Sequence, residues 1–131
     1  MDWLLKTEPT EYSFEDLARE KRTAWSGVAN PLARKHLALA SRGDRVVVYH
    51  TGAVRAAVGI GKVVSVPRPD PEDPKGVVVD VAAVRHLHAP VPLAAIKASP
   101  LFAGSALVTS GRLSVVPLTP EQYSFLAGHP A

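Results

Sequence analysis

The feature that most constrains the fold is a series of β-branched segments in the middle of the chain, between Arg45 and His88. Residues 45–50 read RVVVYH, residues 56–66 read AAVGIGKVVSV, and a valine-rich segment follows Lys75 and Gly76. β-Branched and aromatic residues favour strands, and several short strands favour a small curved sheet. Helical patterns lie near both ends, which indicates an α+β order. The chain is predicted to form a twisted, partly closed β-barrel with peripheral α-helices.

The flanking segments carry clear start signals for helices. Ser13 is a good N-cap, because acidic residues follow it in the first turn of the predicted helix. Asn30 caps a second helix with Pro31 at its first position, and Arg42 and Gly43 are predicted to end it. The remaining expected elements are a strand over residues 2–6, a rigid polar loop over 66–75, a short helix over 93–97, a strand over 113–116 and a helix starting with a capping box at Thr119.

Two glycines in the middle of the chain suggest a local packing constraint. Gly59 and Gly61 fall on one face of their predicted strand. Two missing side chains on one face indicate a tight bend, or a place where another group approaches the backbone.

Length and charge restrict the classes of protein to consider. The 131 residues suit a single domain over residues 1–131, and the net charge of +3 permits a phosphate-facing surface without requiring one. The absence of cysteine excludes disulfides, thiolate catalysis and cysteine zinc sites. No segment approaches the roughly 20 apolar residues of a membrane span, and the first residues do not match a secretory signal. We expect a cytoplasmic monomer that binds no membrane.

Several motifs in order carry a resemblance to a known family. The segments are WLLKTEP, YS (Tyr12 and Ser13), WSGVAN, a GD before VVVYHT, VGIGKVV and SGRLSVVPLT. Together they resemble the EVE domain family of the PUA-like superfamily, over Trp3 to about Leu126. The family is similar in fold to YTH domains, so the resemblance implies a PUA-like fold and a nucleic-acid-binding reader of a modified base in RNA or DNA. The base would be of the 5-methylcytosine or N6-methyladenine type.

The sequence departs from the family pattern at two places. The family commonly has Arg-Asn-Tyr-Gln after the Gly-Val of the second motif, whereas this chain has Ala29, Asn30, Pro31 and Leu32. The loop that often supplies a tryptophan is cut to Glu72–Gly76. The first change removes a plausible phosphate or base contact, and the second removes one candidate wall of a base pocket.

Trp25 is the main candidate for a base-stacking residue. It is followed by Ser26 and Gly27 in a predicted short connection between two helices. A tryptophan beside small residues can present its indole face to a flat ligand, and such stacking is worth roughly 1–3 kcal/mol per base. The alternative is that Trp25 fills the core between the helices. Resemblance to the cage tryptophan of YTH domains favours the pocket.

Six polar residues complete the predicted pocket: Lys6, Thr7, Ser26, Asn30, His50 and Thr51. Lys6 and Thr7 end the first strand, where they could read the edge of an extruded base or form a solvated strand end. Asn30 offers a donor and an acceptor, but it is also the predicted helix cap. His50 and Thr51 end the YHT strand and border the pocket by resemblance, although a lone histidine is more often structural.

Phosphate contacts are predicted from the distribution of basic side chains. Arg112 could bind a phosphate or pair with a carboxylate in the fold. His86 and His88 share a strand face but lack a third metal ligand, so we expect no metal and no cofactor. The predicted phosphate-binding residues are Arg34, Lys35, Arg42 and Arg112, with Arg45 and Arg55 as further candidates.

An enzyme is the main alternative to a binding domain. ASCH-type domains of the same superfamily are similar in size, and some are proposed amidohydrolases of modified cytidines that use Lys, Thr and Glu. Here Lys6, Thr7 and Glu8 are adjacent. Alternation along a strand predicts that Thr7 faces away from the other two, so we favour a protein without catalytic residues. A protein-interaction module is a third interpretation, and it would need an exposed apolar patch.

Overall fold

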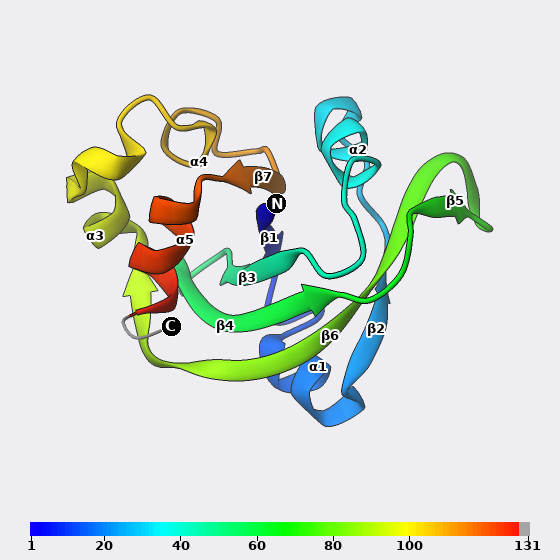
Figure 1. Cartoon of the computed structure of the whole chain (residues 1–131), viewed down its shortest axis with the longest axis horizontal. Helices are drawn as coiled ribbons and strands as arrows, with labels where there is room; N and C mark the ends of the chain where they lie inside the picture. The colour runs from blue at the N-terminus through cyan, green and yellow to red at the C-terminus, as the bar shows by residue number, and fades with distance from the viewer. Residues whose placement is uncertain (129–131) are drawn as a thin grey trace.

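The computed structural model describes residues 1–128, and its framework is one strongly curved sheet of seven strands (Figure 1). Six strands follow the order β2-β6-β4-β3-β1-β7, and β5 pairs with β6 outside this path. The strands are β1 (Asp2–Thr7), β2 (Arg22–Trp25), β3 (Arg45–His50), β4 (Ala56–Val63), β5 (Arg68–Asp70), β6 (Asp73–Pro92) and β7 (Val115–Leu118).

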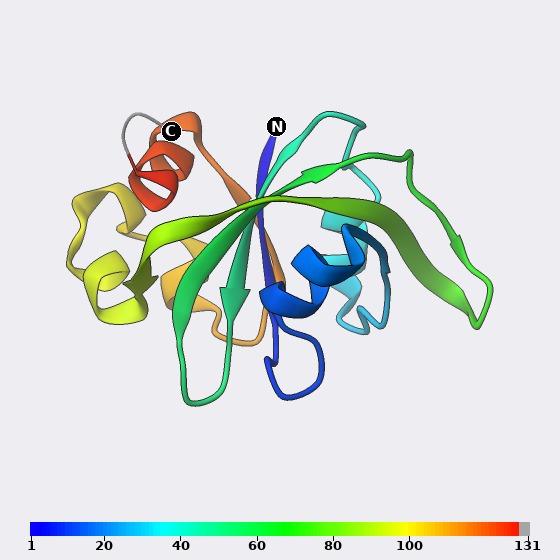
Figure 2. The same ribbon diagram turned by 90° about the horizontal axis from the view of Figure 1, so that it is seen from below.

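Short helices surround this sheet. They are α1 (Phe14–Glu20), α2 (Pro31–Leu37), α3 (Leu93–Ala98), the 3₁₀ turn η1 (Pro100–Phe102), α4 (Ala106–Thr109) and α5 (Pro120–Ala127). Figure 2 shows β6 curving across the molecule, with α3 and α5 near one end and the β5–β6 arm at the other. Within residues 1–128, no helix combines the length and the apolar character needed to cross a bilayer.

The predicted α+β class with peripheral helices is confirmed. Closure is less than expected: β2 and β7 are the two ends of the sheet and do not pair with each other among residues 1–128. The sheet is therefore curved but not closed into a barrel. Its curvature follows from β6, a strand of 20 residues that pairs with β4, β2 and β5 and has bulges in its register with β4.

β1 lies in the centre of the core. It pairs in parallel with β3 and antiparallel with β7, so that Leu4 lies opposite both Val47 and Val116. Leu4 and Val47 are fully buried. A strand with partners on both sides and apolar residues on both faces is a rigid support, and β1 carries Lys6 and Thr7 at its end.

The predicted helix starts are confirmed. Ser13 and Thr119 both form capping boxes, and the Asn30 side chain accepts hydrogen bonds from the backbone N–H groups of Leu32 and Ala33. The end of α2 was predicted wrongly, because the helix stops at Leu37 rather than near Arg42.

Two strands were missed because tertiary pairing creates them. Residues 22–25, expected as a connection, form β2 along the edge of β6. The expected polar loop over 66–75 contains β5, which turns directly into β6 with Asp70 opposite Asp73. Residues 22–25 are too few to indicate a strand by themselves, and residues 68–70 contain no β-branched or aromatic residue, so pairing with the edge of β6 decides both.

Gly59 marks a close approach, as predicted from its position in β4. A Cβ atom built on Gly59 would lie 2.5 Å from the ring of Phe14, which is itself buried. A Cβ on Gly61 would lie 3.0 Å from the carbonyl oxygen of Ala82 on β6. Phe14 is the first residue of α1, so the bare backbone at Gly59 seats this helix on the sheet.

Gly59→Ala should destabilise the fold, because the new methyl group must displace the Phe14 ring from a packed position. Overpacking of this kind typically costs about 1–3 kcal/mol. Gly111→Ala is the matched control, because a Cβ at Gly111 meets nothing within 4 Å. Urea unfolding of both variants measures the difference. Equal midpoints would show that the contact between Phe14 and Gly59 relaxes without cost.

Candidate functional site

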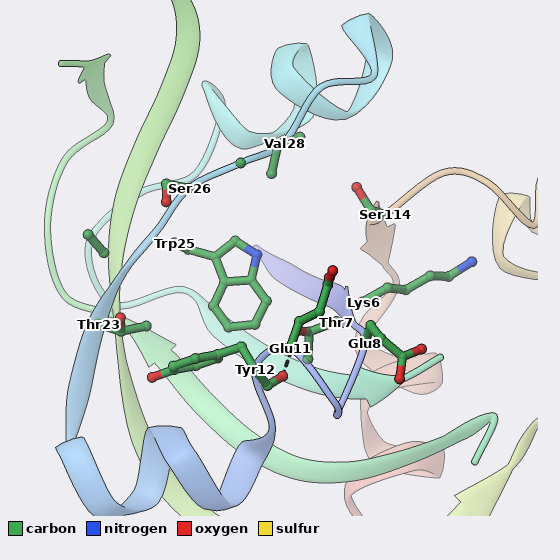
Figure 3. Close-up of a pocket in the computed structure, with 12 residues that line it drawn as sticks. Lys6, Thr7, Glu8, Glu11, Tyr12, Thr23, Trp25, Ser26, Val28 and Ser114 are labelled. Atoms are coloured by element: carbon green, nitrogen blue, oxygen red, sulfur yellow. Dashed lines mark hydrogen bonds between the residues drawn. The ribbon is translucent and has the colours of Figure 1, made fainter. Parts of the chain in front are cut away.

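A cavity of about 410 Å³ opens where the end of β1, the segment before α1 and the end of β2 meet (Figure 3). We call it the aromatic cavity. Its size lies within the range of small-ligand sites in proteins. It is lined by Lys6, Thr7, Glu8, Glu11, Tyr12, Thr23, Ala24, Trp25, Ser26, Gly27, Val28 and Ser114.

Trp25 forms one wall of the aromatic cavity and also belongs to the hydrophobic core. It is the last residue of β2, opposite Val79 of β6, and only 8% of its surface is exposed. Figure 3 shows the indole between Val28 and Tyr12. Within residues 1–128 the indole Nε1 donates no hydrogen bond, and it is not sealed off from solvent. It can therefore donate to a ligand in the cavity. The two interpretations of Trp25, core residue and pocket wall, therefore hold together.

Tyr12 is a second aromatic wall that the sequence analysis missed. Its ring lies edge-on to Trp25, with centroids 6.3 Å apart and an interplanar angle of 89°. Its hydroxyl donates to Glu20 Oε1 at 2.6 Å, and its carbonyl accepts from Thr7 Oγ1 at 2.7 Å. Burial and the Glu20 hydrogen bond raise the pKa of Tyr12. The Tyr-Ser pair before α1 was the available signal, but its distance from Trp25 along the chain concealed their contact.

Lys6, Thr7 and Glu8 all line the aromatic cavity. Their side chains reach different partners, in keeping with the predicted alternation: Thr7 bonds to Tyr12, whereas Lys6 reaches Gly111 and Glu8 lies beside Thr51. Thr7 Oγ1 is engaged with Tyr12, and Glu8 Oε1 accepts from the backbone N–H and hydroxyl of Thr10. The Lys6 ammonium donates to the carbonyl oxygen of Gly111 at 3.1 Å, and Figure 3 shows it extending away from Trp25.

Asn30, His50 and Thr51 were predicted to border the same pocket, and the structure does not place them there. Asn30 acts as the cap of α2. His50 is buried, and its Nε2 accepts a hydrogen bond from the backbone N–H of Phe14 at 3.0 Å. Thr51 lines a neighbouring hollow instead. Of the predicted pocket residues, the aromatic cavity contains Lys6, Thr7, Trp25 and Ser26.

Some of the predicted phosphate-binding arginines are held by contacts within the fold. Arg34 donates from Nε to the carbonyl oxygen of Val28 and from Nη2 to Asp73. Arg45 pairs with Asp2 at 2.8 Å and lies over the ring of Tyr123. These contacts occupy the two guanidinium groups, which makes both poor candidates for a ligand anion.

The other basic candidates are exposed. Lys35 lies on α2, Arg42 lies in the turn before β3, and Arg112 lies between α4 and β7. Arg55 is exposed beside a second hollow near the aromatic cavity. All four keep side chains that a phosphate could reach.

No metal centre is formed by the described part of the chain, where no three side chains of the ligating types lie close enough together. His86, one of the two histidines on β6, packs edge-on against Phe14 with ring centroids 4.8 Å apart. Its position is explained by this packing.

The comparisons with known proteins agree with this architecture. The EVE domain family model matches residues 2–129 of the chain. The chain belongs to the EVE domain family. Mouse thymocyte nuclear protein 1 is 34% identical to it, across 95% of this chain and 71% of the mouse protein. A structure from Rhodopseudomonas palustris superimposes with a TM-score of 0.90 at 38% identity, covering 96% of this EVE domain and 90% of the other chain.

One solved relative carries a ligand. The human THYN1 protein was crystallised in complex with DNA containing 5-methylcytosine, and it matches this EVE domain with a TM-score of 0.84 and 30% identity. The match covers 96% of this chain and 95% of the human one. An ASCH protein from Zymomonas mobilis is similar in fold, with a TM-score of 0.65 at 12% identity over 95% of each chain.

His50 should make the stability of the domain depend on pH. Burial lowers its pKa from the usual 6.5, against the opposing charges of Glu15 and Glu8. The unfolded chain therefore takes up a proton at a higher pH than the folded one, so the contribution of His50 is present above about pH 6.5 and declines as the pH falls. A protonated imidazole also has no nitrogen left to accept from Phe14.

Urea unfolding at about pH 7.5 and pH 5.5, on either side of the ordinary histidine range, tests this expectation. The parent should lose more stability on acidification than His50→Gln, whose amide oxygen can accept the same bond at both pH values. His88→Gln is the matched control because His88 is exposed. The same loss in the parent and in His50→Gln would contradict the assignment.

Proposed function

We propose that this EVE domain is a DNA-binding reader that holds one modified base, of the 5-methylcytosine type, in the aromatic cavity. The observation that carries the proposal is the pairing of Trp25 and Tyr12 around a cavity of about 410 Å³. The relative solved with 5-methylcytosine-containing DNA, at 30% identity over nearly the whole chain, supports the choice of ligand.

The two aromatic rings suit an extruded base. A base that leaves the duplex loses its stacking partners, and aromatic side chains restore part of that energy. Trp25 Nε1 can donate to an acceptor, and the hydroxyls of Thr23 and Ser26 can donate or accept at the base edge. The backbone at Gly27 adds polar groups without a side chain to exclude the ligand.

Selectivity for the methyl group depends on shape. Burying one methyl is worth about 0.8 kcal/mol, or roughly fourfold in affinity. A larger preference requires an unmethylated base to leave a void in the cavity. Tyr12 supplies the second aromatic wall that the shortened loop at residues 72–76 cannot, but the cavity is open at the exposed Glu11 and Ser26. We therefore expect a preference of about tenfold or less by this transfer argument.

Substitutions at the two walls test the base site. Trp25→Ala would remove a core residue and cost about 3–5 kcal/mol of stability, so Trp25→Phe is the better variant. Tyr12→Leu should weaken binding of a single-stranded oligonucleotide with one 5-methylcytosine by roughly 1–3 kcal/mol. Trp25→Phe should weaken it by less, because a smaller ring remains to stack on the base. Fluorescence anisotropy measures the affinity, and circular dichroism melting confirms the fold of each variant.

Tyr12→Phe is the matched control, because it keeps the ring and removes only the hydroxyl bonded to Glu20. It should bind as the parent does. An oligonucleotide with cytosine in place of 5-methylcytosine measures the preference for the methyl group. An oligonucleotide with RNA sugars measures the preference for DNA over RNA. If Trp25→Phe and Tyr12→Leu both fold and bind like the parent, the base site lies elsewhere.

We propose further that this domain acts by binding and not by catalysis. Its Lys6, Thr7 and Glu8 side chains bond to three different partners, Gly111, Tyr12 and Thr10, and among residues 1–128 none of the three bonds to another as a nucleophile and its base would. The likeness to the ASCH protein, at 12% identity, concerns the fold alone.

Acylated cytidine nucleosides should therefore not be turned over by this protein. Chromatography of overnight incubations at high protein concentration measures the product, with Lys6→Ala as the comparison. Product formed by the parent and lost in Lys6→Ala would replace the binding proposal with an amidohydrolase.

A further inference from the structure

A second hollow of about 280 Å³ lies beside the aromatic cavity. It is formed by the turn between β3 and β4 together with α3 and α4, and we call it the basic cavity. We propose that the basic cavity binds a phosphate of the DNA backbone next to the base held in the aromatic cavity. This proposal rests on the proposed function. The lining residues that carry the argument are Lys6, Tyr49, Thr51, Arg55, Lys97 and Gly111.

The charge of the basic cavity has one sign. Lys6, Arg55 and Lys97 line it, and no aspartate or glutamate does. Glu8 lies at its border, where Thr51 Oγ1 donates to Glu8 Oε2 at 3.4 Å, and it is also held by two hydrogen bonds from Thr10. Three cations and one bordering carboxylate leave a net positive hollow, which matches a phosphate diester.

The lining groups also match phosphate in their hydrogen-bonding chemistry. Lysine and arginine donate charge-assisted hydrogen bonds to phosphate oxygens, and Thr51 adds a hydroxyl. The turn that carries Arg55 has an unusual backbone: Arg55 has φ 47° and Gly52 has φ 71°. Arg55 Nε donates to the carbonyl oxygen of Gly52 at 3.3 Å, which holds the guanidinium group beside the turn and leaves its two terminal nitrogens for an anion.

Lys6 connects the two cavities. It lines both of them, and its ammonium donates to Gly111, which lines only the basic cavity. Burial lowers the pKa of Lys6, and an anion in the basic cavity would offset this cost of desolvation. A nucleotide with its base between Trp25 and Tyr12 can therefore extend its phosphate past Lys6 toward Arg55 and Lys97.

The first experiment uses inorganic phosphate, which carries no base, and detects binding by amide chemical shifts in ¹⁵N NMR spectra. Titration should shift the amides of Gly52 and Gly111 in the parent. Arg55→Gln and Lys97→Ala should each weaken this binding roughly three- to tenfold, as expected for a partly exposed charge contact. Lys62→Ala is the matched control, since Lys62 is exposed and lines neither cavity.

The second experiment separates a backbone phosphate from a free nucleotide. A single-stranded oligonucleotide with one 5-methylcytosine is compared with the same strand in which neutral methylphosphonates flank that base. Neutralisation should weaken binding to the parent and to Lys62→Ala by roughly three- to tenfold. The doubly substituted Arg55→Gln, Lys97→Ala protein, which keeps only Lys6 of the three cations, should show a clearly smaller difference between the two strands.

The outcomes are distinguishable from failure of the base site. Phosphate shifts at Gly52 and Gly111 that disappear in the two variants support the proposal even if Trp25→Phe leaves oligonucleotide binding unchanged. Shifts located elsewhere, or the same phosphate affinity in the parent and in both variants, overturn it. A methylphosphonate strand that binds the parent as well as the natural strand shows that the flanking phosphates are not bound, and it overturns the backbone assignment.

Discussion

The position of α1 depends on the contact between the Phe14 ring and the backbone of Gly59, which has no side chain. Phe14 lies against Gly59 of β4, where no Cβ atom would fit, and its backbone N–H donates to the buried His50 at the end of β3. These two contacts fix the first residue of α1. Tyr12 lies two residues earlier and is joined to β1 through Thr7. The second wall of the aromatic cavity is thus held by the packing of Phe14 on the sheet.

Trp25 couples the cavity to the core in a different way. As the last residue of β2, it is fixed by pairing with Val79 of β6, and most of its surface is covered. One ring therefore stabilises the sheet edge and lines the cavity. A site built on a paired strand keeps its geometry when empty, which reduces the entropy lost when a ligand binds.

The net charge of +3 does not show which charged side chains pair with one another in the fold. Arg22 and Arg68 both bind Asp80, and the Arg68 hydrogen bond is the larger cause of the lowered pKa of that carboxyl. Arg34 and Arg45 are likewise paired with carboxylates. Many arginines therefore hold elements of the fold together. The positive charge near the aromatic cavity comes from a smaller group around Lys6, which could concentrate an anion locally.

The sequence by itself determined the α+β class, the helix caps at Ser13, Asn30 and Thr119, and Trp25 as a cavity residue, because these depend on local propensity and on short motifs. It did not determine β2 or β5, since the free edge of β6 induces both. Asn30 was also placed in the site for its donor and acceptor groups, and His50 was placed there by resemblance to the family. Only the tertiary structure showed that those groups already bond to the α2 backbone and to Phe14. Tyr12 was likewise found in the site only from the tertiary structure. Contacts between residues distant in sequence depend on how the sheet curves and packs, and no local sequence pattern indicates them.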